Sequence, residues 1–398
     1  MGNLQITDNS LLDSLKKALA GKVLKKVLLI PPDSTRAHSY GGHITRLLFD
    51  LLGQCHIDVL PALGTHEPIT EAECDSFLGI PYQTIMHHDW RNDVVKLGEI
   101  PGDFISSVTE GLYTESVDVE INKLLLDKSY DLIISIGQVV PHEVVGMANY
   151  SKNIFVGCGG SKLINASHII GAYYGIERTL GRVDTPVRKI FDYAETNFIT
   201  QLPLMYILTV TIEGELDGLY IGRDREIFEQ AAALSKEKNL ISLDSPINKC
   251  VVYLDENEFK STWLGNKAIY RTRMAMADGG ELIIIAPGVR RFGEDDMVDS
   301  LIRKYGYVGR DKLLGLIKDN ADLQNNLCAA AHLIHGSTDG RFTVTYATKH
   351  LTKEEVEGVG FKYMPLDEAM KIYHPPPEGV YFITNPALGL WVYKGRFE

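Results

Sequence analysis

The sequence predicts an α/β protein of two lobes, a larger parallel-sheet domain followed by a smaller α/β lobe. Over the first 240 residues, short apolar runs alternate with amphipathic stretches, and a second such set begins near Asn248. Strand and helix in alternation imply a parallel sheet with helices on its faces. The length of 398 residues also exceeds that of a usual single domain. We therefore expect domains over residues 1–245 and 246–398, with the functional site in the cleft between them.

Local patterns justify each element of the first domain. Apolar runs bounded by turn residues predict buried parallel strands at residues 27–30, 57–60 and 131–135. A helical pattern covers residues 43–52 and closes at Gly53. Thr70 and Glu73 form a capping box, which predicts a short helix after them.

The second lobe is predicted in the same way. Strands are expected at residues 250–253, 281–285, 341–346 and 379–382, and helices at 296–305 and 322–335. Turn residues between 243 and 248 favour a boundary there. Three consecutive prolines at 375–377 would allow the final segment to return to the first domain.

Composition excludes several classes of protein. The chain has 40 Lys and Arg against 52 Asp and Glu, a net charge of −12, which argues against nucleic acid or an anionic membrane as partner. No apolar run reaches the ~20 residues of a membrane-spanning helix. The first ten residues lack the basic start and apolar core of a secretory signal, and the five cysteines form no CxxC pair. We expect a soluble, cytoplasmic protein; a homo-oligomer stays open.

Polar side chains follow the first two predicted strands, where sites of parallel sheets lie. Asp33, Thr35 and Arg36 occur in the segment PPDSTR, and an arginine there suits a carboxylate or phosphate. On composition alone, a helix-entry turn with an exposed arginine is favoured. His66, in ALGTHEP, is a candidate general acid or base because its pKa lies near neutrality. A structural role for His66 is equally favoured.

The segment after residue 135 is the richest in candidate groups. It contains His142, Lys152 and His168, with the glycine-rich stretch GCGGSK between the last two. GCGGSK is not a phosphate loop, because Leu163 rather than Ser or Thr follows Lys162, so its glycines are interpreted as a tight turn. Three histidines could also bind zinc, although no HExxH pair is present.

Two further histidine pairs occur elsewhere in the chain. His87 and His88 are adjacent, and we interpret them as structural or surface residues. His332 and His335 are three apart on a predicted helix and so share one face. They could line the cleft, although a polar helix face is the favoured interpretation.

Taken together, these motifs resemble the nickel-dependent lactate racemase family. PPDSTR, ALGTHEP, GQVVPHE, Lys152 and His168 occur in the order and spacing of that family, over most of residues 25–200. The joint match is much more specific than any one motif. The later part of the chain resembles the family only loosely, as a smaller α/β lobe that closes over the site.

The resemblance implies a nickel-pincer nucleotide, a pyridinium-3,5-bisthiocarboxylic acid mononucleotide that carries nickel. Lys152 would hold it covalently through a thioamide, and His168 would be the nickel ligand. His66 and His142 would be the two acid/base residues. Asp33, Thr35 and Arg36 would contact the cofactor, and Arg36 would also bind the substrate carboxylate. Cofactor-synthesis proteins would be required as partners. The first domain would then be the cofactor-binding catalytic domain.

The implied activity is inversion of C2 of a 2-hydroxy acid by reversible hydride transfer. A residue on each side of C2 would move the hydroxyl proton, which explains two histidines. Ala148–Ser151 replaces a smaller Ser-Gly-Gly stretch of the family, and Lys162 is the second candidate for the tether.

The second lobe departs further from the family, which favours a substrate other than lactate. Arg303, His332 and His335 are the candidate substrate contacts there. A sugar acid of the gluconate/mannonate type is favoured, with malate or lactate as other 2-hydroxy acids. Two alternatives stay open: a zinc-dependent lyase or dehydratase that uses His66, His142 and His168, and a non-catalytic small-molecule sensor.

Overall fold

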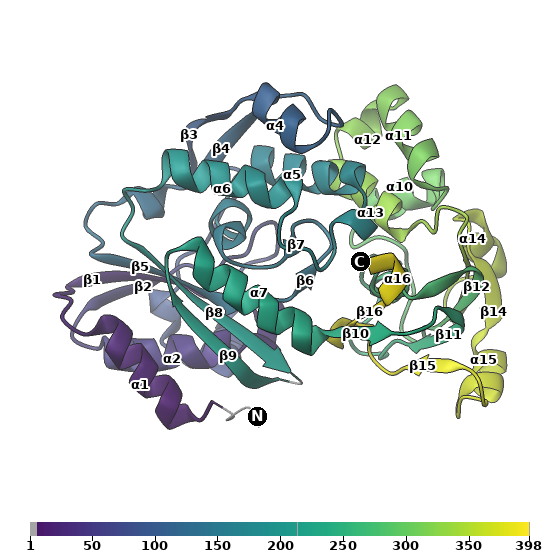
Figure 1. Cartoon of the computed structure of the whole chain (residues 1–398), viewed down its shortest axis with the longest axis horizontal. Coiled ribbons are helices and arrows are strands. Elements are labelled where there is room, and N and C mark those ends of the chain that lie inside the picture. Colours follow the sequence, from purple (N-terminus) through teal and green to yellow (C-terminus); the bar gives the residue numbers. More distant parts are fainter. Residues whose placement is uncertain (1–5, 213, 398) are drawn as a thin grey trace. The chain divides into compact units, whose positions relative to one another are not determined.

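The computed structural model of the chain describes residues 6–212 and 214–397 and confirms the predicted α/β class (Figure 1). Residues 1–5, the start of the segment assessed for a secretory signal, lie outside the described residues. The chain divides into two compact units. Unit 1 comprises Met1–Ile170 and Leu180–Lys238, and unit 2 comprises Gly171–Thr179 and Asn239–Glu398. The predicted domain boundary at residue 245 and the predicted cleft between the two domains stay predictions.

Unit 1 is built on a five-stranded sheet of order β2-β1-β5-β8-β9. Its first four strands are parallel and β9 is antiparallel to β8. The strands are β1 (Lys26–Ile30), β2 (His56–Val59), β5 (Leu132–Gln138), β8 (Leu204–Ile212) and β9 (Glu215–Gly222). The three strands predicted from apolar runs are confirmed, because β1, β2 and β5 cover them.

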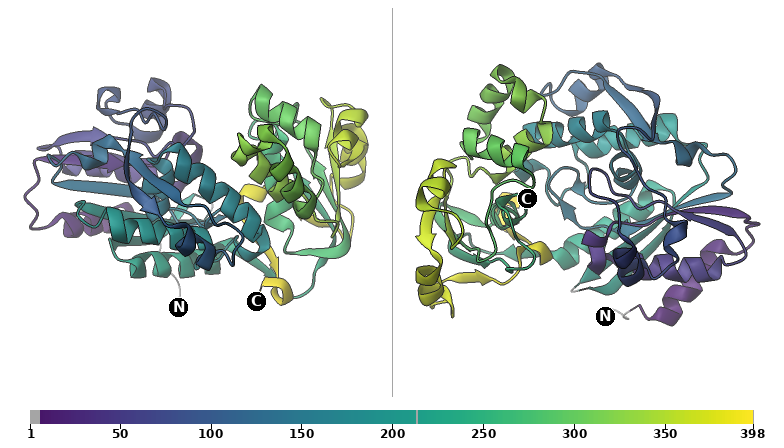
Figure 2. Two further views of the ribbon diagram at one scale, coloured as in Figure 1. Left: turned by 90° about the horizontal axis from the view of Figure 1, so that it is seen from above. Right: turned by 180° about the vertical axis from the view of Figure 1, so that it is seen from behind.

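Helices cover both faces of this sheet, as two separate views show (Figures 1 and 2). Side chains alternate along β1, so Val27 and Leu29 pack with α1 and α2 while Leu28 and Ile30 pack with α5, α6 and α7. The helices of this part of the chain are α1 (Asp8–Leu19), α2 (Gly41–Leu51), α3 (Glu71–Glu73), α4 (Gly102–Val108), α5 (Ser161–Tyr174), α6 (Pro186–Phe198) and α7 (Arg225–Asn239). The apolar run of β1 therefore contributes side chains to the hydrophobic core on each face of the sheet.

Short elements connect these layers. The capping box of Thr70 and Glu73 is confirmed at the start of α3. Two antiparallel pairs lie outside the main sheet, and both precede α5 in the chain. They are β3 (Val94–Ile100) with β4 (Val117–Asn122), and β6 (Pro141–His142) with β7 (Gly146–Met147). The single turns are η1 (Ser34–Ser39), η2 (Cys74–Leu78), η3 (Tyr82–Thr84), η4 (Lys123–Leu126), η5 (Asn153–Gly157), η6 (Ile176–Arg178) and η7 (Pro386–Leu388).

Unit 2 contains a second five-stranded sheet, of order β14-β13-β12-β11-β15 and parallel throughout. A further parallel pair, β10 with β16, joins the start and the end of unit 2. The strands are β10 (Leu240–Leu243), β11 (Ile247–Tyr253), β12 (Met276–Ile285), β13 (Thr343–Thr348), β14 (Lys362–Pro365), β15 (Tyr381–Ile383) and β16 (Leu390–Tyr393). The final segment of the chain thus belongs to unit 2.

The helices of unit 2 correct one prediction. Residues 322–335 were expected to form one helix, but the structure has two, which are separated by Asn325 and Asn326. The Asn326 side chain donates to the Asp322 carbonyl (2.9 Å), a local bond that competes with helix continuation. The helices are α8 (Thr262–Gly265), α9 (Lys267–Thr272), α10 (Asp296–Tyr305), α11 (Arg310–Asp319), α12 (Ala321–Gln324), α13 (Leu327–Gly336), α14 (Lys353–Gly358), α15 (Leu366–Tyr373) and α16 (Lys394–Phe397).

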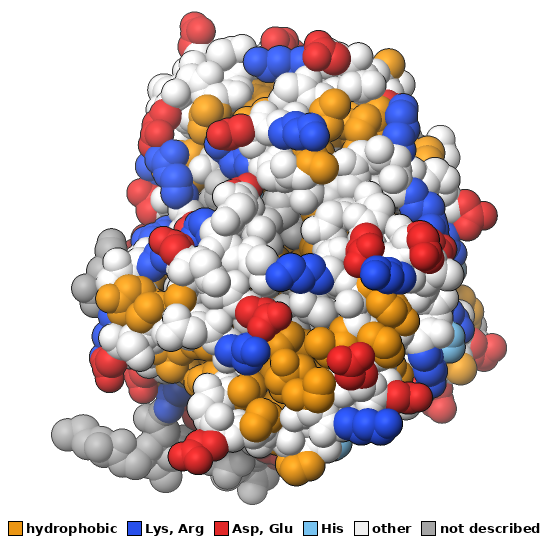
Figure 3. Space-filling view, turned by 90° about the vertical axis from the view of Figure 1, so that its right-hand side faces the viewer, with side chains coloured by type: hydrophobic (Ala, Val, Ile, Leu, Met, Phe, Trp, Pro, Cys, Tyr) orange, Lys and Arg blue, Asp and Glu red, His pale blue; other side chains and the backbone are white. Residues whose placement is uncertain are grey.

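The surface of unit 2 around α14 and α15 carries charges of both signs. Figure 3 shows Lys and Arg side chains interspersed with Asp and Glu there, with apolar side chains between them. None of the helices in the described part of the chain combines the length and the hydropathy of a membrane-spanning segment.

Candidate functional site

The carboxyl ends of β1 and β2 bring Asp33 and His66 together. Parallel pairing continues past both strands, with a bridge between Pro32 and Ala62 and a bond from the Ala62 N–H to the Pro31 carbonyl (2.8 Å). The loops that follow therefore leave the sheet side by side. His66 Nδ1 lies 2.5 Å from Asp33 Oδ2. Sequence analysis assigned these residues separately, and their pairing is a finding of the structure.

The Asp33 carboxylate holds a defined position. It caps η1, because its Oδ1 accepts bonds from the backbone N–H (3.1 Å) and from the hydroxyl of Thr35. Burial by itself would raise the pKa of Asp33, but the bond and charge of His66, with Thr35 and Arg36, lower it below its usual value. Asp33 is therefore an ionised acceptor, and His66 Nδ1 must carry the proton between them. In the neutral ring, the lone pair of His66 therefore lies on Nε2.

In His142, Nδ1 accepts a hydrogen bond, whereas in His66 it donates one. It ends β6, and its Nδ1 accepts a hydrogen bond from the Val144 N–H (3.1 Å) within the β6–β7 hairpin. In the neutral ring the proton therefore lies on Nε2. Burial, and then the charges of Lys152 and Arg36, hold the pKa of His142 well below its ordinary value, against the effect of Glu143. His142 is 12% exposed, whereas His66 is 52% exposed.

Lys152 directly precedes η5 and is half-buried. Burial, followed by the Arg36 charge, lowers the pKa of Lys152 to about 8, although Glu143 and Asp33 oppose this. About a tenth of the amine is therefore neutral at pH 7, far more than for an ordinary lysine, and the neutral form is what a nucleophilic lysine requires. Lys162, the second candidate, is exposed at the start of α5.

His168 lies on α5, with one ring nitrogen already engaged. Its Nδ1 donates to the Ile164 carbonyl one turn earlier (2.7 Å). Burial lowers the pKa of His168, and the charge of Lys152 acts in the same direction, against the effect of the bond to Ile164. A neutral imidazole with Nδ1–H fixed by a carbonyl presents Nε2 as a metal ligand.

The structure brings four of the predicted groups within electrostatic reach of one another. The charges of Lys152, Arg36 and His168 all act on His142, and that of Arg36 also acts on Lys152. The Arg36 and Thr35 side chains are themselves exposed. The η5 turn joins this cluster to the His66 loop, because the Gly64 N–H donates to the Gly157 carbonyl (2.8 Å).

The glycine-rich stretch serves close packing, as the tight-turn interpretation implied. A Cβ on Gly157 would lie 2.6 Å from the Ala62 Cβ, and one on Gly159 would lie 1.9 Å from the Phe155 carbonyl oxygen. His88 is buried beside this turn and bonds to the Gly159 carbonyl (3.1 Å), in keeping with a structural role.

Comparison with known families identifies this region. Residues 6–175 match the family described as the lactate racemase N-terminal domain. These residues, less than half of the chain, are similar to that domain. The resemblance noted in the sequence is thereby confirmed, and a racemase or epimerase type of function is supported. The predicted site residues numbered 33 to 168 all fall inside this lactate racemase N-terminal domain.

Two solved structures resemble the whole chain. One is a crystal structure of a protein from Thermotoga maritima, 26% identical, with a TM-score of 0.85 and coverage of 99% of both chains. The other is the lactate racemase apoprotein from Thermoanaerobacterium thermosaccharolyticum, 17% identical, with a TM-score of 0.73 and coverage of 96% of this chain and 92% of that one. At 17% identity, the similarity to the lactate racemase apoprotein shows a shared fold alone. No curated protein matches the chain.

The remaining predicted contacts lie outside the lactate racemase N-terminal domain, in unit 2. Arg303 is paired with Asp299 (2.6 Å) and Glu355 (2.9 Å). His332 stacks on Trp263, with ring centroids 4.4 Å apart. His332 and His335 are both buried, which corrects the expectation of a polar helix face: α13 packs this side inward. The substrate roles of Arg303, His332 and His335 stay predictions.

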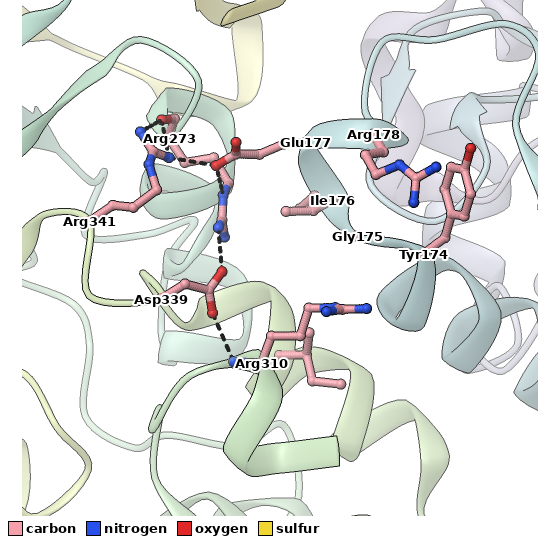
Figure 4. Close-up of a pocket in the computed structure, with 10 residues that line it drawn as sticks. Tyr174, Gly175, Ile176, Glu177, Arg178, Arg273, Arg310, Asp339 and Arg341 are labelled. Carbon is pink, nitrogen blue, oxygen red and sulfur yellow. Dashed lines mark hydrogen bonds and ion pairs between the residues drawn. The ribbon is translucent and has the colours of Figure 1, made fainter. Parts of the chain in front are cut away.

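A cavity of about 280 Å³ in unit 2 is walled by an ion-pair network (Figure 4). Arg273, 3% exposed, contacts Glu177 (3.0 Å) and Asp339 (2.9 Å). Arg341 contacts the same Glu177 carboxylate (2.5 Å). Through Glu177, these ion pairs connect Gly171–Thr179 to the rest of unit 2. This segment contains the end of α5 and the residues that follow it.

Breaking this network is expected to destabilise the protein. Arg273→Met would leave Asp339 without its buried cation and Glu177 with Arg341 alone, and we expect the free energy of unfolding to fall by about 2 kcal/mol. Arg303→Met removes pairs that are 38% exposed on the arginine side, and there we expect a loss below about 1 kcal/mol. Urea denaturation of the two variants measures the difference, and equal losses would contradict this reading.

Arg188 is a residue of this region that the sequence analysis did not single out. It lies fully buried in α6 behind the segment that leads to Lys152. The only signal was an arginine among the apolar positions 187, 190 and 191 of an amphipathic helix. Among the described residues, no group of three or more His, Cys, Asp or Glu side chains is placed to hold a metal ion.

Proposed function

We propose that the chain is a racemase or epimerase of 2-hydroxy acids that uses a nickel-pincer nucleotide held by Lys152 and His168. The observation that carries the proposal is the half-buried Lys152 amine, whose pKa is lowered to about 8, within electrostatic reach of two largely neutral imidazoles. The lactate racemase N-terminal domain that contains these groups supports it.

The donor set fits such a cofactor. Lys152 offers a neutral amine for a thioamide bond, and His168 offers Nε2 as a single protein ligand for nickel(II). Asp33, Thr35 and Arg36 lie on the loop after β1, where a mononucleotide would be bound. When bound, the nickel-pincer nucleotide supplies a hydride acceptor for C2 of the substrate.

The two histidines would share the proton transfers. In the neutral ring, His66 Nε2 has a lone pair because Asp33 holds the proton on Nδ1, and it would accept the hydroxyl proton of the substrate. His142 carries its proton on Nε2 because the Val144 N–H occupies Nδ1, so it donates a hydrogen bond to the substrate oxygen. For the roles to exchange with the substrate of opposite configuration, His142 would give up the Val144 bond and take the other tautomer, with its lone pair on Nε2.

Arg36 would bind the substrate carboxylate. Its guanidinium is exposed at the start of η1, and its charge reaches His142 and Lys152. A planar guanidinium gives a two-point contact that fixes the direction of C2. The substrate class is a 2-hydroxy acid, with a sugar acid of the gluconate/mannonate type first, then malate and lactate.

Intact-protein mass spectrometry tests the proposal directly. The protein is coexpressed with the cofactor-synthesis proteins, and the same sample is analysed for nickel and zinc. We expect a covalent mass increase that maps to Lys152, with about one nickel per chain as a single pincer site requires. The loaded protein is then incubated with each 2-hydroxy acid, and inversion is followed by chiral chromatography.

Two outcomes would overturn the proposal. Zinc without a covalent adduct would favour the lyase or dehydratase alternative. A loaded protein that binds 2-hydroxy acids without inverting any of them would favour a sensor. A host without the synthesis proteins serves as the control, and its protein should show neither adduct nor nickel.

A further inference from the structure

Arg188 is a buried cation that bonds to neutral groups, while the buried Glu195 carboxyl acts on it through its charge. Its side chain is 0% exposed, and within the described residues its hydrogen bonds go only to neutral acceptors. The guanidinium also lies 4.3 Å from the centre of the Phe228 ring. A desolvated charge whose hydrogen bonds go to neutral groups costs stability, and an apolar side chain of similar volume would often be more stable. A buried charge that costs stability is expected mainly at functional sites, where its effect on neighbouring groups is used.

The acceptors of Arg188 form one short segment of chain. The guanidinium donates to the Met147 carbonyl (2.7 Å), the Asn149 carbonyl (3.1 Å) and the Ser151 hydroxyl (2.8 Å). Ser151 directly precedes Lys152. One rigid, planar group therefore bonds the backbone and side chains of the segment 147–151, which leads into the proposed tether.

That segment has a conformation that needs external support. Asn149 and Tyr150 have φ of +65° and +58°, a left-handed conformation that side chains other than glycine adopt at a cost. Tyr150 is clamped on the far side, where its ring stacks on Phe228 (5.2 Å between centroids) and its hydroxyl donates to the Arg223 carbonyl (2.9 Å). The bonds of Arg188 and the contacts of the Tyr150 side chain thus both hold the strained segment, and both groups pack against Phe228.

We propose that Arg188 is a positioning residue, which fixes the segment 147–151 and thereby sets the orientation of the Lys152 amine. The importance of this orientation rests on the proposed function, but the positioning itself does not. A lysine held in one orientation loses less conformational freedom when it reacts, so attachment becomes faster.

Besides positioning the segment through its hydrogen bonds, Arg188 would favour the neutral form of the Lys152 amine through its charge. Lys152 is faced by Arg36 from η1, Glu143 from the β6–β7 hairpin, Asp33 from the loop after β1, and Arg188 from α6. His142 and His168 also interact electrostatically with it. Arg188 lowers the pKa of Lys152 from inside the core, where solvent does not screen it.

The test uses the protein without cofactor, so that it does not depend on the proposed function. Acetic anhydride is added in limiting amount across a range of pH, and the rate of Lys152 acetylation is read by peptide mass spectrometry. The variants are Arg188→Met, Arg188→Lys and Ser151→Ala. The control is Lys189→Met, the neighbouring exposed residue of α6, whose partner is Asp184 (3.2 Å). Circular dichroism establishes that each variant is folded.

We expect Arg188→Met to move the midpoint of the Lys152 profile to higher pH and to slow acetylation at pH 7 by less than about tenfold, the effect of one pKa unit, because burial, Arg36 and Glu143 affect that pKa more strongly. Arg188→Lys should keep the midpoint, because the charge remains, but should slow attachment of the cofactor in coexpressed protein. Ser151→Ala should give a smaller loss, and Lys189→Met none. Ser151→Ala and Arg188→Lys carry the test if Arg188→Met does not fold.

Folded Arg188 variants whose Lys152 profile and cofactor attachment both equal those of the unmodified protein would overturn the proposal and leave Arg188 a structural residue. A shifted Lys152 profile in a protein that never acquires an adduct would support positioning by Arg188 while contradicting the proposed function. The two hypotheses therefore fail separately.

Discussion

Lys152→Ala is expected to abolish covalent attachment of the nickel-pincer nucleotide. The amine is the proposed attacking group, and its environment favours the neutral form because burial and the Arg36 charge lower its pKa to about 8. Lys152→Arg should fail equally, since a guanidinium keeps the charge but is not nucleophilic. Intact mass spectrometry after coexpression measures the loss. Lys162→Ala is the matched control, because that lysine is exposed on α5, and it should retain the full adduct.

The same pKa predicts a pH dependence. An amine with a pKa near 8 becomes more reactive as pH rises from 6 to 8 and levels off above it, whereas an ordinary lysine continues to gain up to about pH 10. Acetylation of Lys152 and of exposed lysines in one sample gives both curves. Coincident curves, or an adduct that persists in Lys152→Ala, would contradict the assignment of the tether.

Asp33→Asn is expected to reduce the rate of inversion by about 10²–10⁴-fold, the range of a misplaced general base. An asparagine amide can donate to His66 Nδ1, which would move the ring proton to Nε2 and remove the lone pair that accepts the substrate proton. The measurement is the turnover number of loaded protein, corrected for the nickel content of each sample. His66→Ala should lose at least as much.

The control for Asp33→Asn is Thr35→Val, which removes the hydroxyl bond to Asp33 but leaves the carboxylate and the backbone bond in place. We expect its turnover to fall by less than about tenfold, because one neutral hydrogen bond is of modest strength. A rate for Asp33→Asn equal to that of the unmodified protein would show that His66 does not depend on Asp33.

Local signals predicted much of the fold. The apolar run at residues 27–30 and the helix at residues 296–305 appear in the structure as β1 and α10, because each is determined by short-range periodicity and turn residues. The helix expected over residues 322–335 failed at Asn325 and Asn326, where side-chain bonds to the backbone compete with the helix. The strand β8 was not predicted, although its run LMYILTVTI carries the same apolar signal as β1.

The candidate site was predictable only as separate motifs. Spacing and resemblance indicated His66, His142, Lys152 and His168, but not the bonds that give each ring nitrogen its role. Those depend on contacts between residues far apart in the chain, such as Asp33 with His66. Arg188 was missed for the same reason, since its partners lie 37 to 41 residues away. Sequence patterns predict secondary structure, whereas the protonation state of each side chain is determined by its tertiary contacts.

The way the chain passes between the two units has a consequence for evolution. Gly171–Thr179 belongs to unit 2 although it lies between two parts of unit 1, and its Glu177 is the shared partner of Arg273 and Arg341. A recombination event that exchanged residues 239–398 alone would import both arginines without the Glu177 carboxylate that they share. Unit 2 is therefore expected to be inherited with that short insert, and new substrate preferences to arise by point substitution more readily than by exchange of the whole unit.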